Sequence, residues 1–159
     1  MLVRVTIAVL AHLIVSWLHG QAHTRLGVGL SEWQNFYVLT VIVAAPLVAL
    51  ALSFTRYVRA GLWLLLASML GSFIFGAGYH YIIISPDHVA HLPAGDARGL
   101  FRVTAVLLLI TEAFGVVVAA SALKSKSAGY ASYTFSHLVN SRTSASRMSD
   151  CEFSRARRG

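Results

Sequence analysis

Six of the seven histidines lie in or beside long apolar segments of this 159-residue chain. His12, His19 and His23 share one face of a helix, because a helix turns about 100° per residue and these positions fall within about 40° of one another. His19 and His23 are four residues apart, a spacing that lets two imidazoles on one helix face bind the same ion. An imidazole facing lipid costs free energy, so we expect this stripe to face a bundle interior or a water-filled cavity.

Further candidate ligands come from two other parts of the chain. His80 lies at the end of the third apolar segment, after a row of small residues that favours close helix packing. Asp87, His88 and His91 follow in a segment where Pro86 is typical of the first position of a short helix. The expected topology brings these residues to the outer side of the membrane. The predicted metal site there comprises His19, His23, His80, His88, His91 and Asp87.

Imidazole is a common ligand of Cu, Zn and Fe, and carboxylates often support such sites. The apolar part of the chain has no cysteine, which argues against an iron–sulfur cluster. Haem is a narrower option, in which His80 would face His19 or His23 across the macrocycle. The alternative without chemistry is an interhelical polar network that only holds the bundle together.

Glu112 lies near the middle of the fourth apolar segment, at about the depth of His12. A lone carboxylate in hydrocarbon is costly, so Glu112 either carries a proton or finds a partner. We expect a buried His12–Glu112 pair, with Ser16 and Thr104 or Thr111 as polar neighbours. With the histidines further out, the pair could also form part of a proton path, although no comparable residue continues it inward.

Three arginines belong to the outer side: Arg25, Arg98 and Arg102. Arg98 and Arg102 share a helix face, and all three are expected to form salt bridges with outer carboxylates or to bind an anion.

The elements that position these residues follow from composition. The chain is 57% hydrophobic and 12% charged, with a mean hydropathy of +0.68, a balance typical of lipid-embedded proteins. Four apolar segments, at about 5–22, 35–54, 61–84 and 100–123, are each close to the roughly 20 residues that a spanning helix needs. The sequence therefore predicts an all-α integral membrane four-helix bundle over residues 1–123. Pro46 should bend the second helix and free a backbone carbonyl that a neighbour must satisfy.

Residues 124–159 are rich in Ser and Arg and predict a disordered, basic cytoplasmic tail. The tail holds the single cysteine and much of the net charge of +7, so the charge does not indicate a nucleic-acid-binding fold. The distribution of Lys and Arg favours both termini in the cytoplasm, in a plasma membrane or bacterial inner membrane. A cleaved signal peptide is the alternative interpretation of the first segment.

Three functions remain open from sequence. The first is a metal- or haem-binding membrane protein, with redox chemistry as one option. The second is a component of a proton- or metal-coupled transporter, and the third is a packing subunit without chemistry. The small-residue row at Ser68, Ser72 and Gly76 could pair two copies of the chain. Because the chain lacks a nucleophile elbow, a phosphate-binding glycine loop and an HExxH motif, no reaction is assigned.

Overall fold

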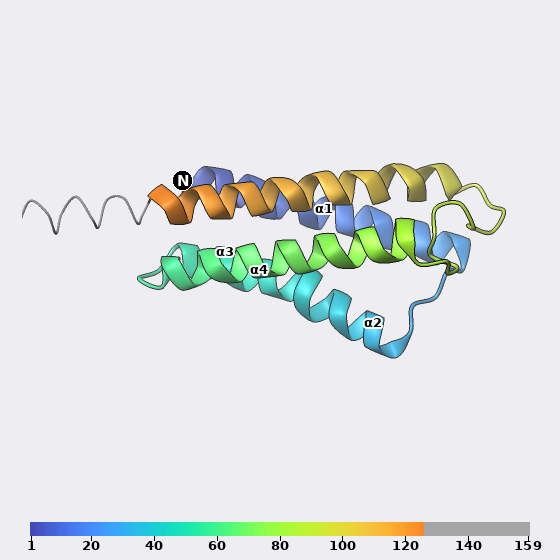
Figure 1. Ribbon diagram of the computed structural model, residues 1–159, viewed down its shortest axis with the longest axis horizontal. Coiled ribbons are helices and arrows are strands. Elements are labelled where there is room, and N and C mark those ends of the chain that lie inside the picture. The colour runs from blue at the N-terminus through green and yellow to red at the C-terminus, as the bar shows by residue number, and fades with distance from the viewer. Residues whose placement is uncertain (126–159) are drawn as a thin grey trace, which may run out of the picture. The chain divides into compact units, whose positions relative to one another are not determined.

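The computed structural model describes residues 1–125, and Figure 1 shows that this part of the chain is built from helices. The expected tail lies outside the described residues, apart from its first two positions, which continue the last helix. The elements are α1 (Leu2–Leu26), α2 (Glu32–Tyr37), the π-helix η1 (Val38–Ala44), α3 (Ala45–Ser53), α4 (Val58–Ala77), the π-helix η2 (Gly78–Ile82) and an unlabelled last helix (Arg98–Ser125).

Together these elements form four helices that are long and apolar enough to cross a membrane. They run over Leu2–Leu26, Glu32–Ser53, Val58–Ile82 and Arg98–Ser125, which confirms the four apolar segments predicted from sequence. Large apolar side chains are exposed on every one of them, as expected for surfaces that face lipid. Examples are Ile7, Ile14, Leu39, Trp63, Ile74, Val103, Ile110 and Val117.

The second span starts with a capping box in which Ser31 and Gln34 each bond the other's backbone. Pro46 follows the π-helical turns of η1 and lies in the first turn of α3. Proline has no N–H, so the carbonyl of Ile42, four residues earlier, loses its usual intrahelical donor. His12 on α1 donates its Nε2–H to that carbonyl at 3.0 Å. The expectation that a neighbouring helix satisfies the freed carbonyl is confirmed.

The two ends of the bundle are packed differently. Figure 1 shows the N-terminus, the α3–α4 turn and the end of the last helix together at one end, here called the inner end. The larger of two apolar clusters joins α1, α3, α4 and the last helix through side chains such as Val9, Leu65, Met69 and Val118. A smaller apolar cluster of Ala22, Leu92 and Phe101 lies at the outer end.

The outer loop does not contain the short helix expected around Asp87, His88 and His91. Successive turns close there through His88 N–H to the Ser85 carbonyl at 3.0 Å and His91 N–H to the His88 carbonyl at 2.8 Å. A helix continuing to His91 would use the carbonyl of Asp87, which accepts from His80 instead. Pro93 has no N–H for the carbonyl of Val89, which accepts from Arg102.

Candidate metal centre

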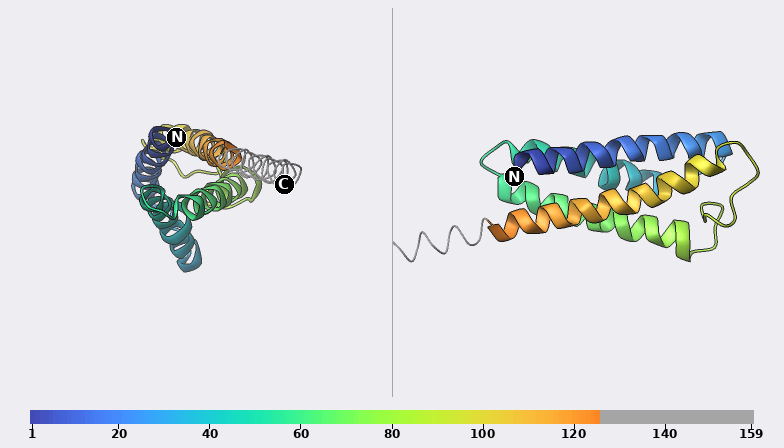
Figure 2. Two further views of the ribbon diagram at one scale, coloured as in Figure 1. Left: turned by 90° about the vertical axis from the view of Figure 1, so that its left-hand side faces the viewer. Right: turned by 90° about the horizontal axis from the view of Figure 1, so that it is seen from above.

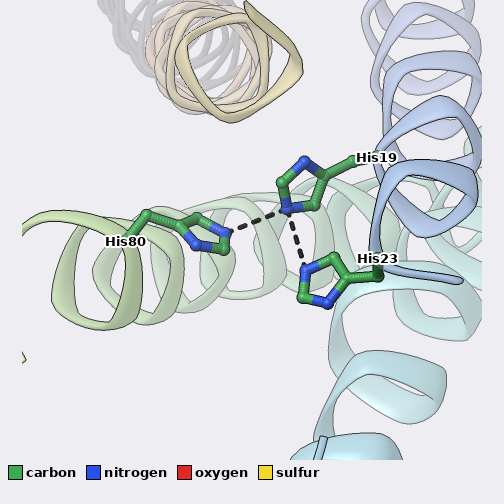
Figure 3. A group of neighbouring side chains, drawn as sticks. All are labelled: His19, His23 and His80. Carbon is green, nitrogen blue, oxygen red and sulfur yellow. Dashed lines mark hydrogen bonds between the residues drawn. The ribbon is translucent and has the colours of Figure 1, made fainter. Parts of the chain in front are cut away.

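Three imidazoles meet at the outer end of the bundle, as Figure 3 shows. His19 is at the centre, with its Nε2 3.2 Å from Nε2 of His80 and 3.2 Å from Nε2 of His23. One ligand atom from each ring lies within 4.8 Å of the other two. This group, His19, His23 and His80, is called the triad below. Its rings are contributed by two helices that are far apart in sequence.

Local structure fixes where each ring stands. His19 and His23 are one turn apart on α1, so both project from the same face. His80 lies in η2, where the wider π-helical turn extends α4. Helix α1 ends at Gly27, whose left-handed φ of 63° a residue with a Cβ would adopt only under strain. The turn at Gly27 brings the carbonyl of Val28 back to His23.

Every ring of the triad has an oxygen partner at Nδ1. The Nδ1–H of His23 donates to the backbone carbonyl of Val28, and the Nδ1–H of His80 donates to that of Asp87, each at 3.1 Å. His19 Nδ1 contacts Thr104 Oγ1 at 2.9 Å. Thr104 donates its hydroxyl proton to the carbonyl of Leu100 at 2.7 Å, so the Thr104 Oγ1 atom accepts the hydrogen bond from His19.

This pattern assigns the tautomers, because a neutral imidazole carries one proton. With the protons on Nδ1, all three Nε2 atoms present lone pairs to one another. Contacts of 3.2 Å between such nitrogens repel unless a cation lies between them. Two ligands of a tetrahedral ion with bonds of 2.0–2.1 Å are about 3.3 Å apart, close to these separations. Hydrogen bonding of each ligating histidine through its other nitrogen is also typical of metal sites.

Asp87 supplies a carboxylate to the same place. Its Oδ1 lies 3.2 Å from His23 Nε2, and its Oδ2 is 4.0 Å from His80 Nδ1. The residue is only 4% exposed, and Oδ1 accepts no hydrogen bond from a described residue. A buried carboxylate oxygen without a donor is costly, which a bound cation would relieve.

Phe101, which is fully buried, forms the apolar wall of the triad. The centre of its ring lies 4.5 Å from that of His19, 4.8 Å from that of His23 and 5.4 Å from that of His80. An apolar wall limits the water around the imidazoles and restricts their movement.

Of the six ligands predicted from sequence, four come together and two stand apart. His88 is half-buried and accepts the N–H of Ala90 through Nδ1, whereas His91 is exposed. Their rings lie 5.1 Å from each other. The triad with Asp87 is therefore the candidate centre.

Arg25, Arg98 and Arg102 form no ion pair within the described part of the chain. Arg25 is exposed, and Arg102 uses its Nε–H on the carbonyl of Val89. Arg98 Nε is buried without a hydrogen-bond partner among residues 1–125. The carboxylate of Asp87 lies against the histidines and not against these arginines.

His12 and Glu112 are both buried, but the structure gives His12 a different partner, the carbonyl of Ile42. His12 Nδ1 and Glu112 Oε2 have no hydrogen-bond partner among residues 1–125. Glu112 instead lines a cavity that also reaches His19, His23, His80 and Asp87.

Sequence reasoning missed three residues that support the centre. The carbonyl of Val28 and the ring of Phe101 carry no signal in the sequence, since any residue has a carbonyl and apolar residues are abundant. Thr104 was expected beside His12 and Glu112, and it bonds His19 instead. Its place on the outer third of the last span was the available clue.

Comparison of the chain with protein-family models, curated proteins and solved structures found no match.

Proposed function

We propose that this chain is an integral membrane protein that binds a transition metal ion through the triad. Asp87 serves as the fourth ligand in this proposal. The observation that carries it is the set of three Nδ1–H groups held by oxygen acceptors, which turns three Nε2 lone pairs toward one point. Neither lipid contact nor helix packing requires that arrangement.

Zn²⁺ suits this ligand set best among Cu, Zn and Fe. Three imidazoles with one carboxylate oxygen match the nitrogen and oxygen ligands and the four-coordinate geometry that Zn²⁺ favours. Copper and iron also bind imidazole, so competition among the three ions decides the native metal. Haem fits less well, because the ring centres of His19 and His80 are only 4.8 Å apart, which leaves no room for a macrocycle between the rings.

The site is proposed to face the outside of the cell, with both termini in the cytoplasm. Arg4, near the start of α1, and Arg56 and Arg59, beside the α3–α4 turn, belong to the inner end, which the positive-inside rule places in the cytoplasm. Access from one side also fits the burial pattern. Among the described residues, the buried ionisable side chains lie at mid-depth or further out. A site reached from outside is thus favoured over a path across the membrane.

Metal analysis of the purified protein tests the proposal. The wild type, stripped by a chelator and reloaded with Zn²⁺ or Co²⁺, should bind about one ion per chain. Co²⁺ should give the intense visible bands of a four-coordinate site. The His19→Ala, His23→Ala double variant should lose the ion, whereas His91→Ala, at an exposed position outside the triad, should keep it. Equal metal content in both variants would refute the site.

A further inference from the structure

A cavity of about 620 Å³ extends from the triad toward the middle of the bundle. It lies between α1, the α2–η1 segment, α4 and the last helix, and its volume is in the range of small-molecule sites. Most of its wall is apolar, with Val38, Ile42, Phe75 and Leu108 among the lining residues. Ser16 and Glu112 contribute polar groups.

The bend of the second span explains why this space exists. Figures 1 and 2 show α2 leaning away from the other helices. The π-helical turns of η1 and Pro46 separate α2 from α3, which stays packed against α4. The outer half of the second span therefore diverges from α1. The cavity opens between helices whose outer surfaces are apolar.

Glu112 brings an unused polar group to this cavity. The residue is 1% exposed, and its Oε2 has no hydrogen-bond partner among residues 1–125. Gly76 keeps the space between this carboxyl and the triad open. A Cβ at Gly76 would lie 3.7 Å from Glu112 Oε2 and 3.9 Å from His80 Cδ2. The carboxyl and the triad thus face one continuous cavity across a position without a side chain.

We propose that this cavity binds a hydroxylated single-chain lipid that enters from the membrane. The head group adds an oxygen to the four-coordinate metal as a fifth ligand and donates a hydroxyl hydrogen bond to Glu112, while the chain occupies the apolar wall. The inference rests on the proposed function only for the contact with the metal; the contact with Glu112 and the chain do not depend on it.

Two features argue for this occupant over water alone. Water makes two to four hydrogen bonds in a buried site, and the larger part of the wall is apolar and offers it none. A ligand from the lipid phase already carries the apolar surface that the wall needs. Its hydroxyl would also supply the donor that Glu112 Oε2 lacks.

Binding of 1-decanoylglycerol to the Zn²⁺-loaded protein, measured by native mass spectrometry from detergent, tests the inference. Methyl decanoate is the matched probe, because it has the same chain and an ester but no hydroxyl. We expect one 1-decanoylglycerol per chain, bound at least about tenfold more tightly than methyl decanoate, as for a hydrogen bond to a buried carboxyl group. Equal affinity for the two probes would overturn the proposal.

Two variants localise the binding. Glu112→Leu removes the oxygen acceptor at similar volume and should weaken 1-decanoylglycerol binding about tenfold. Gly76→Leu should fill the passage and abolish binding, whereas Gly78→Leu, where a Cβ meets nothing within 4 Å, should leave binding unchanged. Helical circular dichroism and metal content identify misfolding of Gly76→Leu, in which case Glu112→Leu decides alone.

The lipid and metal proposals fail separately. If the wild type binds no metal but still prefers 1-decanoylglycerol in a Glu112-dependent way, the lipid site stands and the metal site falls. If the wild type binds metal and neither Glu112→Leu nor Gly76→Leu changes lipid affinity in folded protein, the lipid site is wrong.

Discussion

His19 and Thr104 are 85 residues apart in sequence, and their Nδ1 and Oγ1 atoms meet at 2.9 Å between the first and last spans. The contact holds the proton of His19 on Nδ1 and so turns Nε2 toward His23 and His80. Thr104 therefore positions a ligand without touching the proposed ion. Partners of this kind commonly contribute 10- to 100-fold to metal affinity.

Replacing Thr104 by Val should accordingly weaken Zn²⁺ binding by about 10- to 100-fold while the helices stay folded. Competition with a chromophoric chelator measures the affinity. Thr111→Val is the matched control, because that hydroxyl bonds only the carbonyl of Leu108 in its own helix. If the two variants bind Zn²⁺ equally well, Thr104 does not orient His19.

The carboxylate of Asp87 should matter as a ligand rather than as a surface charge. Asp87→Asn keeps the backbone carbonyl that His80 uses but removes an anionic oxygen 3.2 Å from His23 Nε2. We expect a clear loss of Zn²⁺ affinity and a changed Co²⁺ visible spectrum. Asp96→Asn, at an exposed position of the same loop, is the control. An unchanged spectrum in Asp87→Asn would remove Asp87 from the coordination sphere.

The sequence predicts the bundle well because its signals are local. Four apolar segments and the spacing of His19 and His23 are sufficient to orient α1. The absent N–H of Pro46 likewise predicts that a neighbour must bond a carbonyl of its helix. Each of these inferences needs only the geometry of one helix.

Contacts between distant segments could not be derived in the same way. His12 can reach either Glu112 or a backbone carbonyl, and helix depth alone does not choose between them; the freed carbonyl of Ile42 takes the bond. Which of Asp87, His88 and His91 faces the triad depends on turns of the outer loop, where His80 bonds the carbonyl of Asp87 that a helix would use.

The bond between His12 and Ile42 predicts an energetic coupling to Pro46. His12→Leu leaves the Ile42 carbonyl without a donor in the membrane and should destabilise the protein by about 1–3 kcal/mol. In a Pro46→Ala background, the N–H of residue 46 can take that carbonyl, so the same substitution should cost less. A coupling of about 0.5 kcal/mol or more in the double-mutant cycle, from unfolding in detergent, is expected. Additive effects would show that His12 does not replace the missing intrahelical donor.

The close packing of α3 on α4 depends on Gly61. A Cβ there would lie 2.8 Å from the carbonyl oxygen of Ala49 and 2.9 Å from Cβ of Leu52, so the helices would have to separate. Gly61→Ala should therefore lower the free energy of unfolding by about 1–3 kcal/mol, although alanine is the better helix former. Gly99→Ala provides the matched control, because its Cβ meets nothing within 4 Å, and it should be neutral or stabilising by up to about 1 kcal/mol. Thermal unfolding in detergent compares the two, and a Gly61→Ala protein as stable as Gly99→Ala would mean that α3 and α4 do not pack this closely.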